Sequence, residues 1–229
     1  MHCFDYECAA MPDQIGAGIR FESGSLSVRK CNMMHNEMGL LARNGSAAVH
    51  VGRIATASVT GSYFHHTDLE HLLKSRAAAN QFVDNRSIGC TSKMVNHELK
   101  FPDGGVVFVV CNIISQGLNT GSQKLISFDA EGYKMQSSEI HLEGKTLVNP
   151  LPWGGLFLWV VSGADAIGAA NYRWVGQGKL ESAGPGEHKN NAKINLRDYA
   201  REPGGTGPGL RAMQRQTKCL VHHLQKIQE

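Results

Sequence analysis

The chain has 229 residues, of which 41% are hydrophobic and 19% charged, with a formal net charge of +3. This composition excludes a disordered or strongly charged chain and allows one full hydrophobic core. The longest apolar run, at 151–170, is interrupted by glycines and by Asp165, so it predicts a buried strand and turn rather than a membrane span.

Alternating apolar and polar residues predict half-buried strands along most of the chain. Within the otherwise irregular first 38 residues they occur at 19–22 and 26–29, and Gly24 between them suits a hairpin. The order of the elements shows no internal repeat. Further strands are predicted within residues 47–63 and at 81–83, 106–110, 125–128, 139–142, 156–161 and 172–175.

Residues 67–79 predict one short helix between the early strands. Thr67 and Glu70 form a capping box, and Leu69 and Leu73 lie on one helical stripe. Many short strands with a single helix among them favour a mainly β fold, a jelly-roll-like β-sandwich, over alternating β–α units.

The chain divides into an irregular N-terminal segment at 1–38, a β-sandwich core at 39–183 and a basic tail at 184–229. The tail contains Gly/Pro-rich linkers, and its residues 210–228 predict an amphipathic C-terminal helix. Its excess positive charge favours an anionic partner such as nucleic acid or a membrane surface, while a solvated tail of ordinary charge fits the same composition.

The six cysteines show no Cys-x-x-Cys motif and no regular spacing, and the first residues lack the features of a signal peptide. We therefore expect reduced cysteines and a chain that is not secreted.

Histidines offer one candidate site, because His65, His66 and His71 lie close together in the sequence. Two zinc ligands on a helix are usually four residues apart, which these are not, so a capping and surface cluster is the expected interpretation. No metal or cofactor is expected, and the glycine run at 204–209 lacks the Lys-Ser/Thr that a phosphate loop needs.

A thiol nucleophile is a second candidate, with Cys90 or Cys111 paired to His97 or His141. Cys111 ends a strongly apolar strand, where a buried and inert cysteine is typical. A small hydrolase with such a Cys-His or His-based site is an alternative to a non-enzymatic protein.

A charged triplet, Asp84-Asn85-Arg86, ends the predicted strand at 81–83. An aspartate at a strand end can lock a turn through backbone N–H groups, and Arg86 can pair with it or with phosphate. The triplet is therefore either an ordinary strand-end turn or part of a functional motif.

Short motifs across residues 39–145 resemble plant-virus movement proteins of the thirty-kilodalton superfamily. Residues 49–54, Val-His-Val-Gly-Arg-Ile, resemble the His-(Ile/Val)-Gly strand near the start of that family's core. Residues 82–86, Phe-Val-Asp-Asn-Arg, resemble its Leu-x-Asp motif, with Phe82 in place of leucine. Gly144 stands where the family pattern has a glycine, so the motif residues are Asp84, Arg86 and Gly144.

The resemblance implies a jelly-roll-like domain that binds single-stranded RNA without sequence specificity and self-associates. It also implies location in the host cytoplasm and at plasmodesmata, with host plasmodesmal or membrane-associated proteins as further partners. A viral coat or assembly protein of the same fold is the alternative. In this hypothesis cationic tail residues neutralise RNA phosphates, namely Lys189, Lys193, Arg197, Arg201, Arg211, Arg215 and Lys218.

Overall fold

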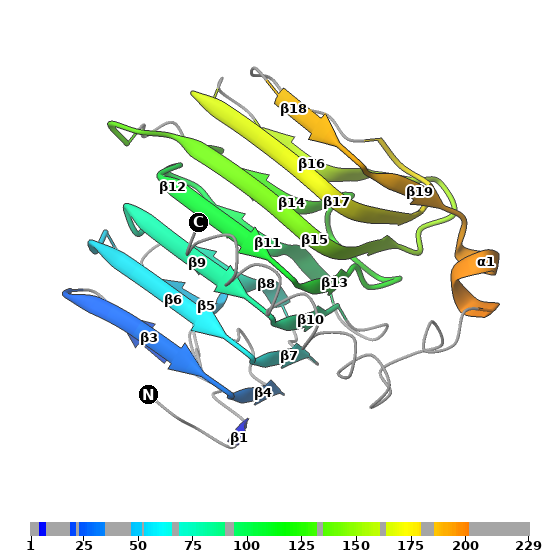
Figure 1. The fold of residues 1–229 in the computed structure, drawn as a ribbon. Coiled ribbons are helices and arrows are strands. Elements are labelled where there is room, and N and C mark those ends of the chain that lie inside the picture. Colours follow the sequence, from blue (N-terminus) through cyan, green and yellow to red (C-terminus); the bar gives the residue numbers. More distant parts are fainter. Residues whose placement is uncertain are drawn as a thin grey trace.

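The strands of this protein wind into a parallel β-solenoid (Figure 1). The structure, a computed structural model, is 61% strand and 3% helix, so the predicted mainly β composition is confirmed. The predicted jelly-roll-like sandwich is wrong, because a jelly roll is antiparallel and each strand here pairs in parallel with strands of neighbouring turns. The residues described are 5–7, 19–21, 23–34, 47–51, 53–65, 69–89, 94–131, 135–160, 164–179 and 186–201.

Successive turns of the solenoid contribute strands to a large and a small sheet. The large sheet has 13 strands: β1 (Asp5–Glu7), β3 (Ser25–Arg29), β4 (Asn32–Met34), β6 (Thr56–Thr60), β7 (Tyr63–His65), β9 (Ala79–Val83), β10 (Arg86–Ile88), β12 (Val106–Val110), β13 (Ile113–Ser115), β15 (Glu139–Asn149), β17 (Ala166–Gly176), β18 (Gly186–Lys189) and β19 (Ala192–Ile194). The small sheet has six: β2 (Ile19–Phe21), β5 (Ala47–Val51), β8 (Leu69–Ser75), β11 (Met94–Phe101), β14 (Lys124–Phe128) and β16 (Leu156–Val160). One helix, α1 (Leu196–Arg201), follows β19.

A sharp corner divides the large sheet within each turn, for example between β9 and β10. The first residue of each corner has a positive φ, and backbone hydrogen bonds link the corners of neighbouring turns. A single left-handed residue turns the chain tightly, and Gly144 adopts this conformation without steric cost. The residues in this column are Lys30, Gly61, Asp84, Cys111, Gly144, Asn171 and Asn190.

The next residue of several corners carries a buried polar side chain that bonds to a neighbouring turn. The Ser62 N–H donates to Asn85 Oδ1 and the Asn85 N–H donates to Asn112 Oδ1, both at 2.8 Å. Asn85 Nδ2 donates to the Val59 carbonyl at 2.8 Å, and Asn112 Nδ2 donates to the Phe82 carbonyl at 2.7 Å. These bonds satisfy buried polar groups and set the register between turns, and we name Ser62, Asn85 and Asn112 the amide column.

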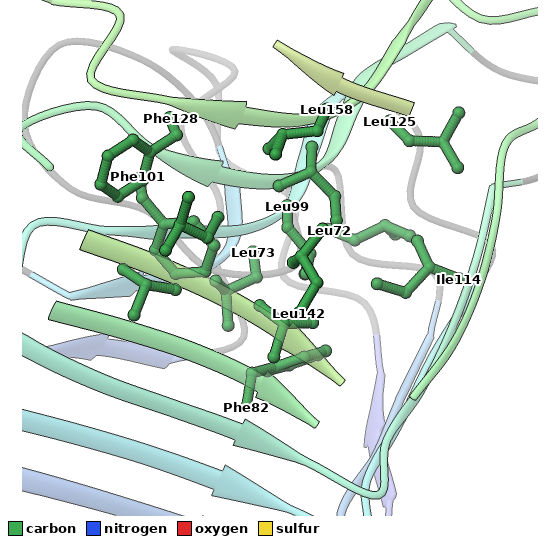
Figure 2. Close-up of a cluster of buried hydrophobic side chains, with 14 of the residues drawn as sticks. Leu72, Leu73, Phe82, Leu99, Phe101, Ile114, Leu125, Phe128, Leu142 and Leu158 are labelled. Carbon is green, nitrogen blue, oxygen red and sulfur yellow. The ribbon is translucent and has the colours of Figure 1, made fainter. Parts of the chain in front are cut away.

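The core lies between the two sheets, where equivalent apolar residues of successive turns stack on one another. Figure 2 shows Phe82 and Leu142 reaching from the large sheet toward leucines of the small sheet. Burial of these side chains supplies the hydrophobic stabilisation of the fold. The stacked rows are Val28, Val59, Phe82, Val109, Leu142 and Ala169 in the large sheet and Leu73, Leu99, Ile126 and Leu158 in the small one.

The predicted strands at 26–29, 81–83, 106–110 and 125–128 are confirmed, but three other local predictions are wrong. Residues 69–79 form no helix, because β8 pairs with β5 on one side and β11 on the other. The first two predicted strands form no hairpin, because β2 pairs with β5 and β3 pairs with β6. The fold does repeat, but its equivalent corner residues are 31, 23, 27, 33, 27 and 19 residues apart, so no fixed period marks it.

The start of the predicted tail continues the solenoid, since β18 and β19 pair with β17. The helix predicted at 210–228 lies outside the described residues. Within the described ranges, no helix is long and apolar enough to cross a membrane.

Cys31 and Cys111 are disulfide-bonded, so the expectation of reduced cysteines is wrong for these two. They lie at corners three turns apart, a separation on the order of 14 Å at a strand spacing of about 4.8 Å. Disulfides need Cα atoms within about 7 Å, so the two cysteines are not bonded to each other.

Candidate functional site

Two adjacent strands of the small sheet carry the same four-residue pattern, His-x-Leu-Lys. It occurs at 71–74 in β8 and at 97–100 in β11, where His71 aligns with His97 and Lys74 with Lys100. The central leucines are buried in the core, while the histidines and lysines form contacts of their own. The parallel register thus places like polar groups on consecutive turns.

Both lysines of this pattern bind one carboxylate, that of Glu131 between β14 and β15. Lys74 Nζ lies 3.0 Å and Lys100 Nζ 2.7 Å from Glu131 Oε1, and the Arg76 guanidinium contacts Oε2. Burial alone would raise the pKa of Glu131, but hydrogen bonds from Lys100 and Lys74 outweigh it and lower this pKa to about 2. Burial and the charge of Lys100 lower the pKa of Lys74, whose side chain is only 1% exposed.

A second carboxylate, Asp103, joins the same network from the turn after β11. The Arg53 Nε–H donates to Asp103 Oδ2 at 2.9 Å, and Arg76 contacts Oδ1. Asp103 is fully buried, whereas Arg53 is 57% exposed. In the ion pairs of the described residues, four cations share two carboxylates, and the network extends from the buried Asp103 to the exposed Arg53.

Aromatic rings adjoin the lysines on the small sheet. Lys124 Nζ lies 3.1 Å from the ring centroid of Trp159, and the His97 ring is stacked 6.3 Å from that indole. The His97 and His71 ring centroids are 5.1 Å apart. Both strand patterns therefore lie within reach of a partly exposed tryptophan on β16.

His97 is a neutral imidazole without a hydrogen-bond partner on either ring nitrogen. Burial first, and then the charges of Lys100, Lys124 and Lys74, lower the pKa of His97 to about 3. An unpaired buried polar group is costly, and such groups are concentrated where proteins bind ligands or catalyse reactions. We name this site the cationic cluster: Lys74, Arg76, His97, Lys100, Lys124, Glu131 and Trp159.

Glu98, next to His97, is a fully buried carboxyl group. Burial raises the pKa of Glu98 well above its usual value, which favours the neutral form of this side chain. Two glycines make room for it: a Cβ on Gly89 would lie 2.7 Å from Glu98 Oε1 and 2.4 Å from the Gly117 nitrogen.

None of the three residues of the movement-protein resemblance lies in the cationic cluster, and two of them lie at solenoid corners. Asp84 and Gly144 both occupy the left-handed corner position of their turns. Arg86 is in β10 with its guanidinium carbon 5.2 Å from the Tyr63 ring centroid, and burial lowers the pKa of Arg86. The structure therefore places Asp84 and Gly144 in one column that turns the chain.

The predicted RNA-binding residues that the structure describes lie at the end of the solenoid. Lys189 Nζ pairs with Glu187 at 2.8 Å, and Lys193 Nζ donates to the Gly178 carbonyl at 2.8 Å. Both Arg197, which is exposed, and Arg201 belong to α1, while Arg211, Arg215 and Lys218 lie outside the described residues.

The predicted Cys-His pairs do not form a site in the described structure. Cys111 is in a disulfide and so supplies no thiolate, and Cys90 lies outside the described residues. His141 stacks on Phe108 with centroids 5.0 Å apart, on the large sheet rather than near His97. Among the residues that the structure describes, no three His, Cys, Asp or Glu side chains are grouped to hold a metal ion.

The histidine cluster predicted from the sequence is divided. His65 is hydrogen-bonded to Asn32 Oδ1 at 2.8 Å in the large sheet, whereas His71 contacts His97 in the small one. His66 lies outside the described residues.

Comparison with known proteins gives no relative from which a function could be transferred. The chain matches no protein-family model, and neither a curated protein nor a solved structure shows a significant similarity to it. The site must therefore be interpreted from its own chemistry.

Sequence reasoning missed most of the cationic cluster. The repeated His-x-Leu-Lys pattern was a readable signal, because two copies in register would place four polar groups together. No sequence signal marks Glu131 or Trp159, since their contact with the lysines depends on how turns of unequal length stack.

Proposed function

We propose that this protein is a binding protein for an acidic polysaccharide, which it recognises at the cationic cluster. The observation that carries the proposal is that Lys100 and Lys124 lie on neighbouring strands of the small sheet and that the Lys124 ammonium lies over Trp159. Lysines supply the charge that attracts carboxylate or sulfate groups, and a flat indole supplies a surface on which a sugar ring can pack.

The solenoid geometry favours a linear polymer over a small isolated anion. Neighbouring strands are about 4.8 Å apart, so equivalent side chains recur at that interval along the solenoid axis. Lys74 and Lys100 are equivalent residues of this kind. In the same row Lys100 is in register with Ser127 and Ser127 with Trp159, so a chain of acidic sugars lying across the strands would meet a cation and then an indole, and such repeated weak contacts raise affinity.

Lys124 is the cation best placed to meet such a ligand. Unlike Lys74 and Lys100, it forms no ion pair within the described part of the chain, and its ammonium group lies over Trp159. Burial lowers the pKa of Lys124, because partly buried surroundings solvate the ammonium group less well than water does. A ligand anion would restore favourable interactions that the partly buried ammonium lacks.

Single-stranded RNA, the partner expected from the movement-protein resemblance, stays a prediction and is less well supported by this site. Proteins that bind single strands without sequence preference combine exposed cations with several stacking aromatics. The cluster offers one tryptophan, and Lys74 is almost fully buried. RNA binding by the tail is a separate hypothesis, and the same experiment addresses it.

Binding should be measured calorimetrically with three polymers: a galacturonic acid homopolymer, its neutral methyl ester and a random-sequence single-stranded RNA. We expect the protein to bind the acidic polymer alone, and this binding should weaken as salt is added.

Trp159→Ala should weaken binding of the acidic polymer about tenfold, equivalent to about 1.4 kcal/mol, and Lys124→Ala should reduce both affinity and salt dependence. Lys189→Ala, an exposed lysine outside the cluster, is the matched control and should leave polysaccharide affinity unchanged.

Equal binding of the methyl ester would contradict recognition of charge. Binding of RNA without binding of the acidic polymer would overturn the proposal and favour the nucleic-acid hypothesis instead.

A further inference from the structure

Glu131 is bound by the cluster as a ligand carboxylate would be. Two ammonium groups, from Lys74 and Lys100, hold Oε1 at 3.0 and 2.7 Å, and Arg76 contacts Oε2. The two oxygens thus have separate cationic partners, an arrangement that recognises a planar carboxylate. Lys74 belongs to β8, Arg76 follows that strand directly, and Lys100 belongs to β11. Glu131 comes from the segment that joins β14 to β15.

We infer that Glu131 is an internal occupant of a carboxylate subsite, and that a carboxylate group of an incoming acidic ligand displaces it. This inference rests on the proposed binding of acidic polysaccharide and specifies where one of the sugar carboxylates would sit. It also explains how the site would distinguish acidic from neutral sugars.

The geometry allows the side chain to leave without disturbing the solenoid. Glu131 is 31% exposed, whereas Lys74 beneath it is 1% exposed, so the carboxylate lies on the solvent side of the lysine. Arg76 keeps a second carboxylate partner in Asp103, which is fully buried. Displacement therefore requires rotation of one side chain toward water rather than rearrangement of paired strands.

The same geometry makes displacement selective. Leaving Lys74 buried without an anion is costly, because a desolvated charge loses its compensating partner. Only a ligand that supplies another anion can replace the interactions of Glu131. Since the pKa of Glu131 is about 2, the internal occupant is itself ionised at neutral pH, and a neutral sugar cannot substitute for it.

The test uses Glu131→Gln, which keeps the size of the side chain but removes its charge. In this variant no carboxylate occupies the subsite, so acetate should bind there. The melting temperature in acetate should therefore be higher than in chloride at equal ionic strength. The wild-type protein, whose subsite is filled, should show no such acetate effect. Glu187→Gln, which removes the carboxylate of an exposed lysine pair, is the matched control and should behave as wild type.

The second measurement is the affinity for the galacturonic acid homopolymer. We expect Glu131→Gln to bind it about tenfold more tightly than wild type, because the competing carboxylate is gone. Absence of acetate stabilisation in Glu131→Gln would overturn the subsite. Acetate stabilisation together with unchanged or weaker binding of the homopolymer by this variant would overturn displacement. If wild type and variant both fail to bind the homopolymer while acetate still stabilises the variant, the proposed function fails and the carboxylate subsite stands.

Discussion

Two corners of the same solenoid use polar side chains in opposite ways. In the amide column, Asn85 and Asn112 are fully buried and bond to backbone groups of neighbouring turns. At the turn after the small sheet, Arg76, Asp103 and Glu131 form a charged network that extends to solvent. A closed set of neutral amides that bonds to buried backbone groups has no capacity left for a ligand, whereas a charged network that is partly exposed can exchange one carboxylate for another.

The comparison shows that burial of polar groups does not by itself indicate function. The charged corner differs because two of its groups lack a polar partner among the described residues. His97 has no hydrogen-bond partner, and Lys124 has an indole beneath its ammonium group and no ion pair. We therefore expect substitutions in the amide column to affect folding and those in the cationic cluster to affect binding.

The largest effect on stability is expected from Asn112→Ala. Asn112 Oδ1 accepts from the Asn85 N–H at 2.8 Å, and its Nδ2 donates to the carbonyls of Phe82 and Val110 at 2.7 and 2.9 Å. Alanine leaves these buried groups unsatisfied, so the free energy of unfolding should fall by about 2–4 kcal/mol. Urea denaturation measures this loss, and Gln81→Ala, which removes an exposed amide of β9, is the control, with a change within about 0.5 kcal/mol.

If Asn112→Ala were no less stable than Gln81→Ala, the amide column would not hold the turns together. The proposed separation between a structural and a functional corner would then fail.

A smaller effect, with a distinct pH dependence, is expected from Glu98→Gln. Burial raises the pKa of Glu98 in the folded protein above its usual value of 4.5, so the folded state holds the proton more tightly than the unfolded state. The associated stability is complete below pH 4.5 and is lost as the pH rises through the folded pKa. Glutamine cannot ionise, so the variant should lose less stability than wild type toward alkaline pH.

Melting temperatures of both proteins across a pH series measure this difference. Parallel curves would show that Glu98 does not titrate with folding, and its burial as a neutral acid would be wrong.

Much of the strand content was predictable, because inward-facing residues alternate within a turn. Val107 and Val109 of β12 are buried while Phe108 between them is exposed, which is the period that a sequence displays directly. How the strands pair was not predictable, since the same alternation serves antiparallel and parallel sheets. The corners that decide the pairing carry residues as different as Gly61, Asp84 and Cys111.

The error at residues 69–79 has a specific physical cause. Helical spacing of leucines predicted one apolar stripe, but Leu72 and Leu73 are both buried because β8 is paired on both edges within the sheet. Tertiary pairing therefore outweighed local propensity. The same mistake concealed the site, because a helix would have placed Lys74 and Arg76 on its exposed last turn rather than against Glu131.

Glu131→Gln should show the opposite pH dependence to Glu98→Gln, and over a lower range. Burial raises the pKa of Glu131, but the hydrogen bonds of Lys100 and Lys74 more than offset this and lower it from 4.5 to about 2. This stability is present above pH 4.5 and is lost as the pH falls through about 2. Acid titration of unfolding should therefore be steeper in wild type than in the variant. Equal steepness would mean that the lysines do not hold the carboxylate in solution.

The smallest effect on stability is expected from Lys189→Ala, which also separates the two binding hypotheses. Lys189 and Glu187 pair at 2.8 Å, but their side chains are 69% and 76% exposed, and exposed ion pairs are screened by solvent. We expect no measurable change in unfolding by urea.

If the tail neutralised RNA phosphates, this substitution would lower the salt slope of RNA binding by about one while leaving polysaccharide affinity unchanged. If the small sheet instead held the polyanion, only Lys124→Ala would alter the salt slope, because Lys124 alone of these two lysines belongs to the cationic cluster.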